Sequence, residues 1–247
     1  FTLRESGVAS SLSVTATPAQ GSVSSASTKI TPTSTDILWQ AMDASVPPFY
    51  RGKALPTNES KLRFIAMTDI KSKGIRVPST NLMYTWQHNG TLMKNASGYG
   101  KNAFTIQGSY LDSSNTASVA IETRDTSVKT AGSVRANPVK PFVLWYSADQ
   151  ISGPRFEKAL TDGYAIGKGD ISIIAAPYFF SPGNPTSSKL LYAWTVNGQK
   201  IETPSIPNTL FLRRESDQSG EAVINLSLSN VATLFQEASA KLSLQLQ

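Results

Sequence analysis

Apolar and polar residues alternate along several short segments of the chain. In Leu12–Ala16, Ile224–Leu228 and Leu242–Leu246, every second residue is apolar. This period of two is typical of a strand in an antiparallel sheet that has one face buried and the other in water. Clusters of Ser, Thr, Gly, Pro and Asn separate such segments and indicate turns. The pattern predicts an all-β chain, with at most a short turn of helix over 231–239.

An internal repeat is marked by the four tryptophans. They form two pairs of similar spacing, Trp39 with Trp86 (47 residues apart) and Trp145 with Trp194 (49 residues apart). The second copy is offset from the first by 106 residues at the first tryptophan and by 108 at the second. A nearly constant offset over this length indicates tandem structural repeats.

Each copy carries the motif Tyr-x-Trp-x-x-Asn-Gly, at Tyr84–Gly90 and at Tyr192–Gly198. Asn-Gly favours a type I′ hairpin, because both residues tolerate positive φ. The tyrosine and the tryptophan then share one face of the strand before the turn. A buried tryptophan on a central strand between two sheets is characteristic of immunoglobulin-like sandwiches. Trp86 and Trp194 are therefore predicted to be structural core residues of two antiparallel β-sandwiches.

The motif, roughly midway in a cysteine-free repeat, resembles bacterial immunoglobulin-like domains of the PKD type. A wider pattern resembles an uncharacterised surface-protein family of Patescibacteria, the candidate phyla radiation. That pattern consists of Leu38-Trp39 and the segments 47–55 (PPFYRGKAL), 97–102 (SGYGKN) and 177–180 (PYFF). The resemblance implies export and a β-sandwich fold, and it supplies no activity and no binding residues.

The repeat predicts three parts of the chain. Residues 36–138 and 139–247 are each expected to form one immunoglobulin-like, PKD-like sandwich. Residues 1–35 are expected to be the C-terminal strands of a truncated upstream repeat. Proline-containing joints, which prolines stiffen, separate these parts at Thr31-Pro32-Thr33 and at Asn137–Pro141.

The assignment of residues 1–35 depends on their register with the full copies. Phe1–Arg4 corresponds to Phe104–Gln107, and a polar turn followed by an alternating strand comes next in both. Because an isolated hairpin is marginal in water, these strands are expected to be completed by upstream chain, to pair with another molecule, or to be poorly ordered.

The amino-acid composition narrows the setting in which the protein works. The chain has no cysteine, which excludes disulfides and thiolate metal sites. Because extracellular eukaryotic sandwiches usually carry a disulfide, export in a bacterium, to the cell surface, the periplasm or the medium, is favoured. No apolar run approaches the roughly 18 residues of a membrane span, so contact with a membrane is expected only through segments outside this chain.

The net charge of +6 is unevenly distributed. Residues 36–138 hold 12 Lys and Arg against 7 Asp and Glu, whereas residues 139–247 hold 9 of each. A polyanion could use this excess, but basic side chains at strand edges also discourage aggregation, and the second interpretation is preferred. Nucleic acid is not an expected partner. The basic residues that lie close together are Lys61, Arg63, Lys71, Lys73 and Arg76.

Residues for catalysis are scarce. His88 is the only histidine, so a triad has one candidate base at the end of a predicted strand, and a zinc site lacks ligands. The acidic residues do not alternate as in a calcium loop, although a loose surface calcium site stays an alternative. Gly98–Lys101 has no following helix that could bind phosphate. We therefore expect no enzyme, no cofactor and no metal.

Aromatic residues outside the predicted core strands are the candidate partner-binding residues, because exposed rings stack on sugars or anchor proteins. The alternative is that these rings close the ends of the sandwiches or fill the joints between repeats. The candidates are Phe49, Tyr50, Tyr99, Tyr178, Phe179 and Phe180.

The expected function is that of a non-enzymatic, exported structural or adhesive surface protein. Its tandem repeats would act as spacers and protein-interaction modules, with another protein or another copy of the chain as partner. One alternative is a filament or pilus component that assembles by strand exchange. Another is a carbohydrate-binding accessory module that binds a surface glycan.

Overall fold

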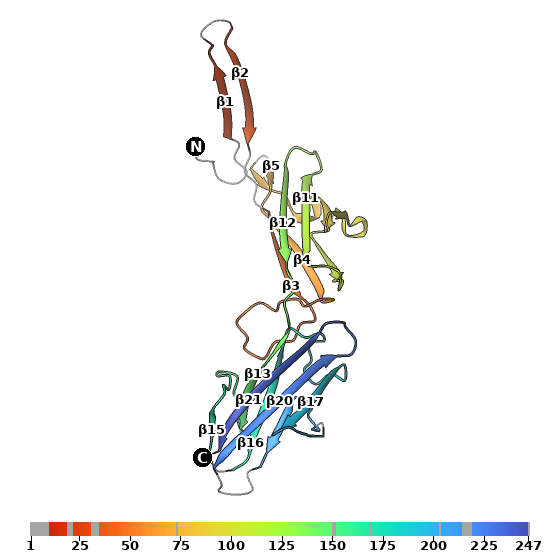
Figure 1. The fold of residues 1–247 in the computed structure, drawn as a ribbon. Helices are drawn as coiled ribbons and strands as arrows, with labels where there is room; N and C mark the ends of the chain where they lie inside the picture. Colours follow the sequence, from red (N-terminus) through yellow and green to blue (C-terminus); the bar gives the residue numbers. More distant parts are fainter. Residues whose placement is uncertain are drawn as a thin grey trace. The chain divides into compact units, whose positions relative to one another are not determined.

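The structure is a computed structural model (Figure 1) that describes residues 10–18, 22–30, 35–72, 74–149, 152–167, 169–202, 204–213 and 219–246. The predicted strand Phe1–Arg4, the joint Thr31-Pro32-Thr33 and Lys73 lie outside these residues. Nearly all regular elements are β-strands; the helices among these described residues are two short 3-10 turns, η1 (Ser79–Asn81) and η2 (Lys94–Ala96). The all-β prediction is confirmed. In the described part of the chain, no helix has the length and apolar character that a membrane span requires.

Residues 142–246 form two sheets that enclose one core. The order in the first sheet is β14 (Gly153–Pro154), β13 (Phe142–Asp149), β16 (Ile171–Tyr178), β19 (Thr209–Leu212). The order in the second is β15 (Tyr164–Ile166), β21 (Glu237–Leu246), β20 (Gly220–Asn230), β17 (Leu190–Val196), β18 (Gln199–Lys200). Neighbours pair antiparallel, except that β15 runs parallel to β21. The buried core combines side chains of both sheets, such as Ile173, Trp194 and Leu226.

Residues 35–136 form a second pair of sheets. The order in one is β10 (Ala103–Gln107), β4 (Lys61–Thr68), β3 (Thr35–Ala41). The order in the other is β12 (Lys129–Ala136), β11 (Asn115–Thr123), β7 (Leu82–His88), β8 (Thr91–Leu92), with β9 (Gly98–Tyr99) also paired to β7. Phe104 links the sheets, because its ring lies 5.2 Å from that of Phe64 and 4.7 Å from that of Trp86. A short hairpin, β5 (Lys71–Ser72) with β6 (Ile75–Arg76), precedes β7.

The two sandwiches share one topology. In each, the first, second and fourth principal strands make one sheet (β3-β4-β10 and β13-β16-β19). The strand that carries the buried tryptophan crosses to the other sheet and pairs with the last hairpin (β7-β11-β12 and β17-β20-β21). This strand order, with a tryptophan on the third strand, is immunoglobulin-like. The chain is therefore a tandem of immunoglobulin-like sandwiches.

The repeated motif makes the same contacts in both copies. The turns have positive φ at both residues, 47° and 79° at Asn89-Gly90 and 51° and 79° at Asn197-Gly198, as expected for type I′. Each asparagine side chain accepts a hydrogen bond from the main chain of the neighbouring strand, at 2.9 Å in the first copy and 2.8 Å in the second. The sequence repeat is thus also a repeat of hydrogen bonds.

The motif tyrosines differ in one respect. The Tyr192 hydroxyl donates to the Pro185 carbonyl at 2.7 Å. The Tyr84 hydroxyl is fully buried, and no described residue accepts or donates a hydrogen bond to it. Burial raises the pKa of Tyr84. The motif tyrosine hydroxyl therefore has a hydrogen-bond partner in the second sandwich and no described partner in the first.

Contacts group the chain into two compact units. Unit 1 comprises Phe1–Trp39, Arg63–Thr105 and Asn115–Ala136; unit 2 comprises Gln40–Leu62, Ile106–Ser114 and Asn137–Gln247. The described strand pairs fall within 35–136 or 142–246, apart from the hairpin of β1 (Ser10–Ala16) and β2 (Ser24–Ile30). The repeat boundaries at 35/36 and 138/139 stay a prediction, and so does the truncation of an upstream repeat.

The loop between β3 and β4 packs within unit 2 and covers the outer face of β16. Ser45 N donates to Phe180 O, and Phe179 N donates to Ser45 O, both at 2.7 Å. Ser45 Oγ donates to Pro177 O at 3.0 Å. Because the sandwich core buries the other face of the strand, seven of the eight residues of β16 are buried. The expected helical turn over 231–239 is wrong, because Asn230 Oδ1 accepts from Ala232 N (2.9 Å) and starts a hairpin loop instead.

Candidate functional site

A pocket of about 530 Å³ lies at one end of the first sandwich, within unit 1. Four separate segments contribute to it: the β5–β6 hairpin, the approach to β7, strand β9, and the end of β11 with its turn. The lining residues are Ser72, Val77, Thr80, Asn81, Tyr99, Thr123, Arg124 and Asp125.

The turn between β11 and β12 supplies three of these residues. Thr126 N donates to Thr123 O at 2.9 Å, and Thr123 N donates to Val128 O at 3.1 Å, which closes the hairpin. Thr126 has a φ of 56°, a left-handed conformation that completes the reversal of the chain. The backbone therefore places Arg124 and Asp125 at the tip of the hairpin, next to the pocket.

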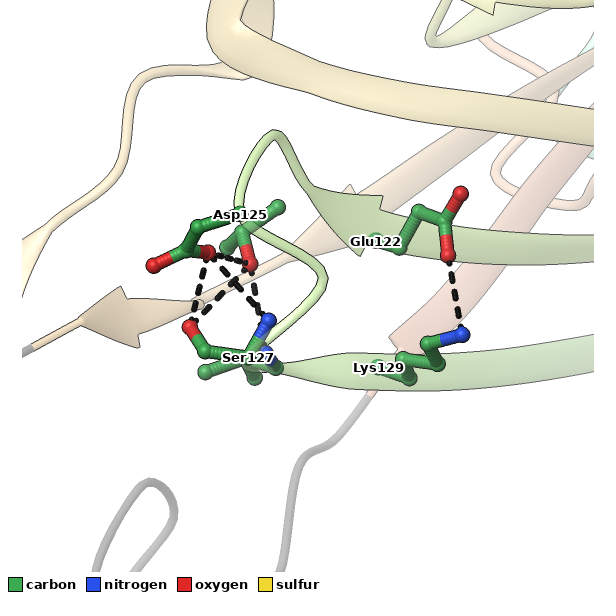
Figure 2. Close-up of polar contacts among 6 residues, drawn as sticks. Glu122, Asp125, Ser127 and Lys129 are labelled. Atoms are coloured by element: carbon green, nitrogen blue, oxygen red, sulfur yellow. Dashed lines mark hydrogen bonds and ion pairs between the residues drawn. The ribbon is translucent and has the colours of Figure 1, made fainter.

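The Asp125 carboxylate is held by its neighbours in the turn (Figure 2). Its Oδ1 accepts from Thr123 Oγ1 at 2.6 Å, from Ser127 Oγ at 2.7 Å and from Ser127 N at 3.2 Å. These bonds, that of Thr123 first, lower the pKa of Asp125 to about 2. All three bonds end on Oδ1, and Figure 2 draws none to the other oxygen. Asp125 is thus a fixed anion whose Oδ2 accepts no bond from the other residues drawn in Figure 2.

The two strands that leave this turn are joined by an ion pair. Lys129 Nζ lies 3.2 Å from Glu122 Oε2 (Figure 2), and the two side chains are 67% and 39% exposed. Exposed pairs of this kind contribute at most about 1 kcal/mol. Glu122 and Lys129 neutralise each other beside the pocket and do not line it.

Tyr99 forms the aromatic part of the pocket. The residue is 51% exposed, and the guanidinium carbon of Arg124 lies 5.6 Å from the ring centroid, within range of a cation–π contact. Gly98 and Gly100 flank it with φ of 142° and 71°, and Tyr99 pairs with Met83 of β7. The two positive-φ glycines make this segment a tightly turned connection between strands.

Phe49 and Tyr50 lie in the β3–β4 loop, within unit 2. Phe49 is 93% exposed and has a φ of 63°. The Tyr50 ring packs edge-on against Tyr178 (5.6 Å between centroids) and Phe179 (6.2 Å). A pocket of about 540 Å³ opens beside them, lined by Pro47, Pro48, Phe49, Tyr50, Arg51, Pro154, Phe156, Glu157 and Tyr178.

The other three aromatic candidates do not present their rings to solvent. Tyr178, Phe179 and Phe180 are 6%, 4% and 0% exposed. The Tyr178 hydroxyl lies 2.8 Å from that of Tyr146, and burial together with this hydrogen bond raises the pKa of Tyr178. The rings fill the space under the β3–β4 loop, so the expectation that they contact a partner is corrected to a packing role.

The predicted core tryptophans and the single histidine have clear positions. Trp86 and Trp194 are 0% and 1% exposed, and each indole donates to a loop carbonyl, Lys101 O at 2.8 Å and Pro207 O at 2.9 Å. His88 ends its strand, with Nε2 3.0 Å from the Asn115 amide oxygen. In the described residues, no group of three or more His, Cys, Asp or Glu side chains could hold a metal ion.

Arg124, Asp125 and Asn81 were not singled out by the sequence as a group. Asp125 is one of several scattered acidic residues in the sequence, and it lies 44 positions after Asn81. The only local signal is the run Thr-Arg-Asp-Thr-Ser, because Asp, Ser and Thr side chains favour turns that they hydrogen-bond themselves. That signal indicates a turn and no binding site.

No family model matches the chain, and no curated protein matches it either. Solved structures resemble it distantly. The three N-terminal domains of the bacteriophage RB49 highly immunogenic outer capsid protein share 13% identity, with a TM-score of 0.43, over 87% of this chain and 59% of theirs. Fibronectin(III)-like modules of Clostridium thermocellum CbhA share 12% identity (TM-score 0.29) over 86% of this chain and 94% of theirs. The ectodomain of mouse nectin-like molecule 4 shares 10% identity (TM-score 0.31) over 87% and 63%. The chain thus spans less than two thirds of the first and third of these structures.

Proposed function

We propose that this protein is a non-enzymatic, exported structural or adhesive surface protein, in which tandem immunoglobulin-like sandwiches act as spacers and present a binding surface. The observation that carries the proposal is the make-up of the pocket in the first sandwich. It combines an aromatic ring, a cation, an anion and an amide on hairpin and loop segments above a rigid sandwich. Such groups serve recognition, for which loops on a sandwich are well suited.

Asp125 is suited to binding and poorly suited to proton transfer. An efficient general acid or base has a pKa near the working pH, whereas hydrogen bonds lower the pKa of Asp125 to about 2. It therefore stays ionised at neutral pH and accepts hydrogen bonds without exchanging a proton. The site supports recognition of a partner over turnover of a substrate.

The spacer role is supported by the joint before the second sandwich. Pro138 and Pro141 each restrict one φ angle of the segment Asn137–Pro141. Val139 N also donates to Pro56 O at 2.8 Å, which ties the joint to the β3–β4 loop within unit 2. The restricted backbone of Asn137–Pro141 suits a spacer protein.

Export and likeness to the Patescibacteria surface-protein family belong to the same proposal. They are supported by the cysteine-free composition and by the sequence patterns around Trp39 and Gly98. Antibodies raised against this chain should label intact cells that produce the full-length protein. Labelling that requires permeabilised cells would refute the surface location.

The filament alternative is favoured by one observation. The hairpin of β1 and β2 is a two-stranded sheet in which every side chain assigned an exposure is exposed, including Leu12 and Val14. Strands of this kind can pair with another chain. Sedimentation of the purified chain over a hundredfold range of concentration tests this, since strand exchange predicts assemblies that grow with concentration.

A further inference from the structure

We propose that the pocket formed by the β11–β12 turn, β9 and the approach to β7 binds a neutral glycan, with Tyr99 against a sugar ring and Arg124, Asp125 and Asn81 hydrogen-bonded to its hydroxyls. The inference rests on the proposed function in one respect, namely that this site binds rather than catalyses.

The polar groups of the pocket match the hydrogen bonds of a sugar. Neighbouring sugar hydroxyls both donate and accept, so they need partners of both kinds. Arg124 offers only donors, the ionised Asp125 offers only acceptors, and Asn81 offers both. The second carboxylate oxygen of Asp125, which carries no drawn bond in Figure 2, is the acceptor left for a ligand.

The apolar groups match the C–H face of a sugar ring. Tyr99 is half exposed and Val77 lies in the same lining. Aromatic rings bind through their faces while their polar tips reach water. Because Arg124 lies over the Tyr99 ring at 5.6 Å, the sugar is placed beside the guanidinium, against the part of the ring that remains exposed.

The charges favour a neutral ligand. Within the lining, Arg124 and Asp125 carry opposite charges. Outside it, Lys129 pairs with Glu122 at 3.2 Å, and Arg76 pairs with Asp69 at 3.3 Å. Arg76 and Lys129 are thus each paired with an anion beside the pocket, and Arg124 lies next to the ionised Asp125. These pairs reduce what a polyanion would gain from the three cations.

The pocket is also arranged before a ligand arrives. Three hydrogen bonds hold the Asp125 carboxylate, and the cation–π contact restrains Arg124. Ordering these side chains beforehand reduces the entropy lost on binding. The volume of the pocket, about 530 Å³, falls within the usual range of small-ligand sites. Val77 is the single aliphatic residue of the lining, so Tyr99 supplies most of its apolar contact surface.

The test is binding of the whole chain to an array of neutral and acidic oligosaccharides, followed by calorimetric titration of each glycan bound. We expect a neutral glycan to bind. Tyr99→Ala and Asp125→Asn should each weaken its affinity at least roughly tenfold, because each removes a stacking face or a charged hydrogen-bond partner. Asp125→Asn retains an oxygen that can accept the bonds of Thr123 and Ser127, so the turn should persist, as circular dichroism and thermal melting would verify.

Two matched controls locate the site. Glu122→Gln changes a charge on the same hairpin outside the lining, and Phe49→Ala removes an exposed ring elsewhere; both should leave the affinity within about twofold, as expected of groups that do not touch the ligand. The proposal is overturned if no neutral glycan binds, if only polyanionic glycans bind, or if Phe49→Ala rather than Tyr99→Ala abolishes binding. Capture of a protein at this pocket, competing with no sugar, would also overturn it. Each of these results leaves the surface-labelling experiment unaffected.

Discussion

Replacement of Trp86 by alanine tests the architecture of the first sandwich most directly. The Trp86 side chain is fully buried, packs 4.7 Å from the Phe104 ring and donates to Lys101 O at 2.8 Å. Burial of an aromatic side chain of about 150–250 Å² at about 25 cal/mol per Å² corresponds to about 4–6 kcal/mol. Alanine retains part of this area, so the expected loss of unfolding free energy is about 3–5 kcal/mol.

This loss is a large part of the stability of an ordinary domain, which is about 5–15 kcal/mol. At about 4–8 °C per kcal/mol, the transition of this sandwich should move down by more than about 12 °C. Urea unfolding followed by far-ultraviolet circular dichroism measures the change. Trp86→Phe should cost less, because it keeps a ring against Phe104, and the exposed Tyr99→Ala should change stability by less than about 0.5 kcal/mol. An unchanged midpoint for Trp86→Ala, with ligand binding abolished, would refute the core position.

Three further predictions follow from local geometry. Tyr84→Phe should leave the free energy of unfolding unchanged or raise it by about 1 kcal/mol, because it removes a buried hydroxyl without a described partner. Tyr192→Phe should lower the free energy of unfolding by about 1 kcal/mol, because it removes a hydrogen bond. Equal losses for the two variants in urea unfolding would contradict this. Gly132→Ala should cost about 1–3 kcal/mol by overpacking, because the new Cβ would lie 2.7 Å from Thr35 O, and an unaltered melting temperature would disprove that approach. The folded-state pKa of Asp125, about 2, lies below the usual value of 3.8, so its stabilising effect is present above about pH 4 and is lost as the pH falls toward 2. Between pH 6 and pH 2, the melting temperature should therefore fall more steeply for the native chain than for Asp125→Asn. Parallel falls in melting temperature would refute the assignment.

Much of the fold was predictable because its determinants are local. The alternation in Ile224–Leu228 and Leu242–Leu246 corresponds to the buried faces of β20 and β21. The Asn-Gly pairs end their strands in positive-φ turns, as their backbone preferences require. Each of these features depends on neighbouring residues and on one core.

The burial of the Tyr178–Phe180 rings could not be predicted from the local sequence pattern. The segment from Ile171 to Phe180 is almost continuously apolar, which fits a strand buried on both faces as well as a strand that ends in exposed rings. The choice depends on the β3–β4 loop, which covers β16 from more than a hundred positions earlier in the chain. No pattern within the segment encodes that cover.

The pocket was missed for a related reason. Its lining residues extend from Ser72 to Asp125, and each looks ordinary beside its neighbours in the sequence. They meet only because β7 pairs with both β9 and β11, which brings Tyr99 and the end of β11 to the same edge. Of the predicted candidates, Tyr99 alone belongs to this pocket, and its exposed ring was the feature that the sequence could indicate.

The parallel pair β15–β21 has a mechanical consequence. Tyr164, Ala165 and Ile166 lie beside Leu244, Gln245 and Leu246, with both strands running in the same direction. If the second sandwich is pulled from its two ends, β15 is drawn toward the start of the chain and β21 toward its end. The strands then slide along each other, and all bonds between them bear the load at once, whereas a hairpin pulled at its open end loses its bonds one after another. Under such tension, this short pair must break, in addition to the pairing of β21 with β20, before the last strand can leave the sandwich.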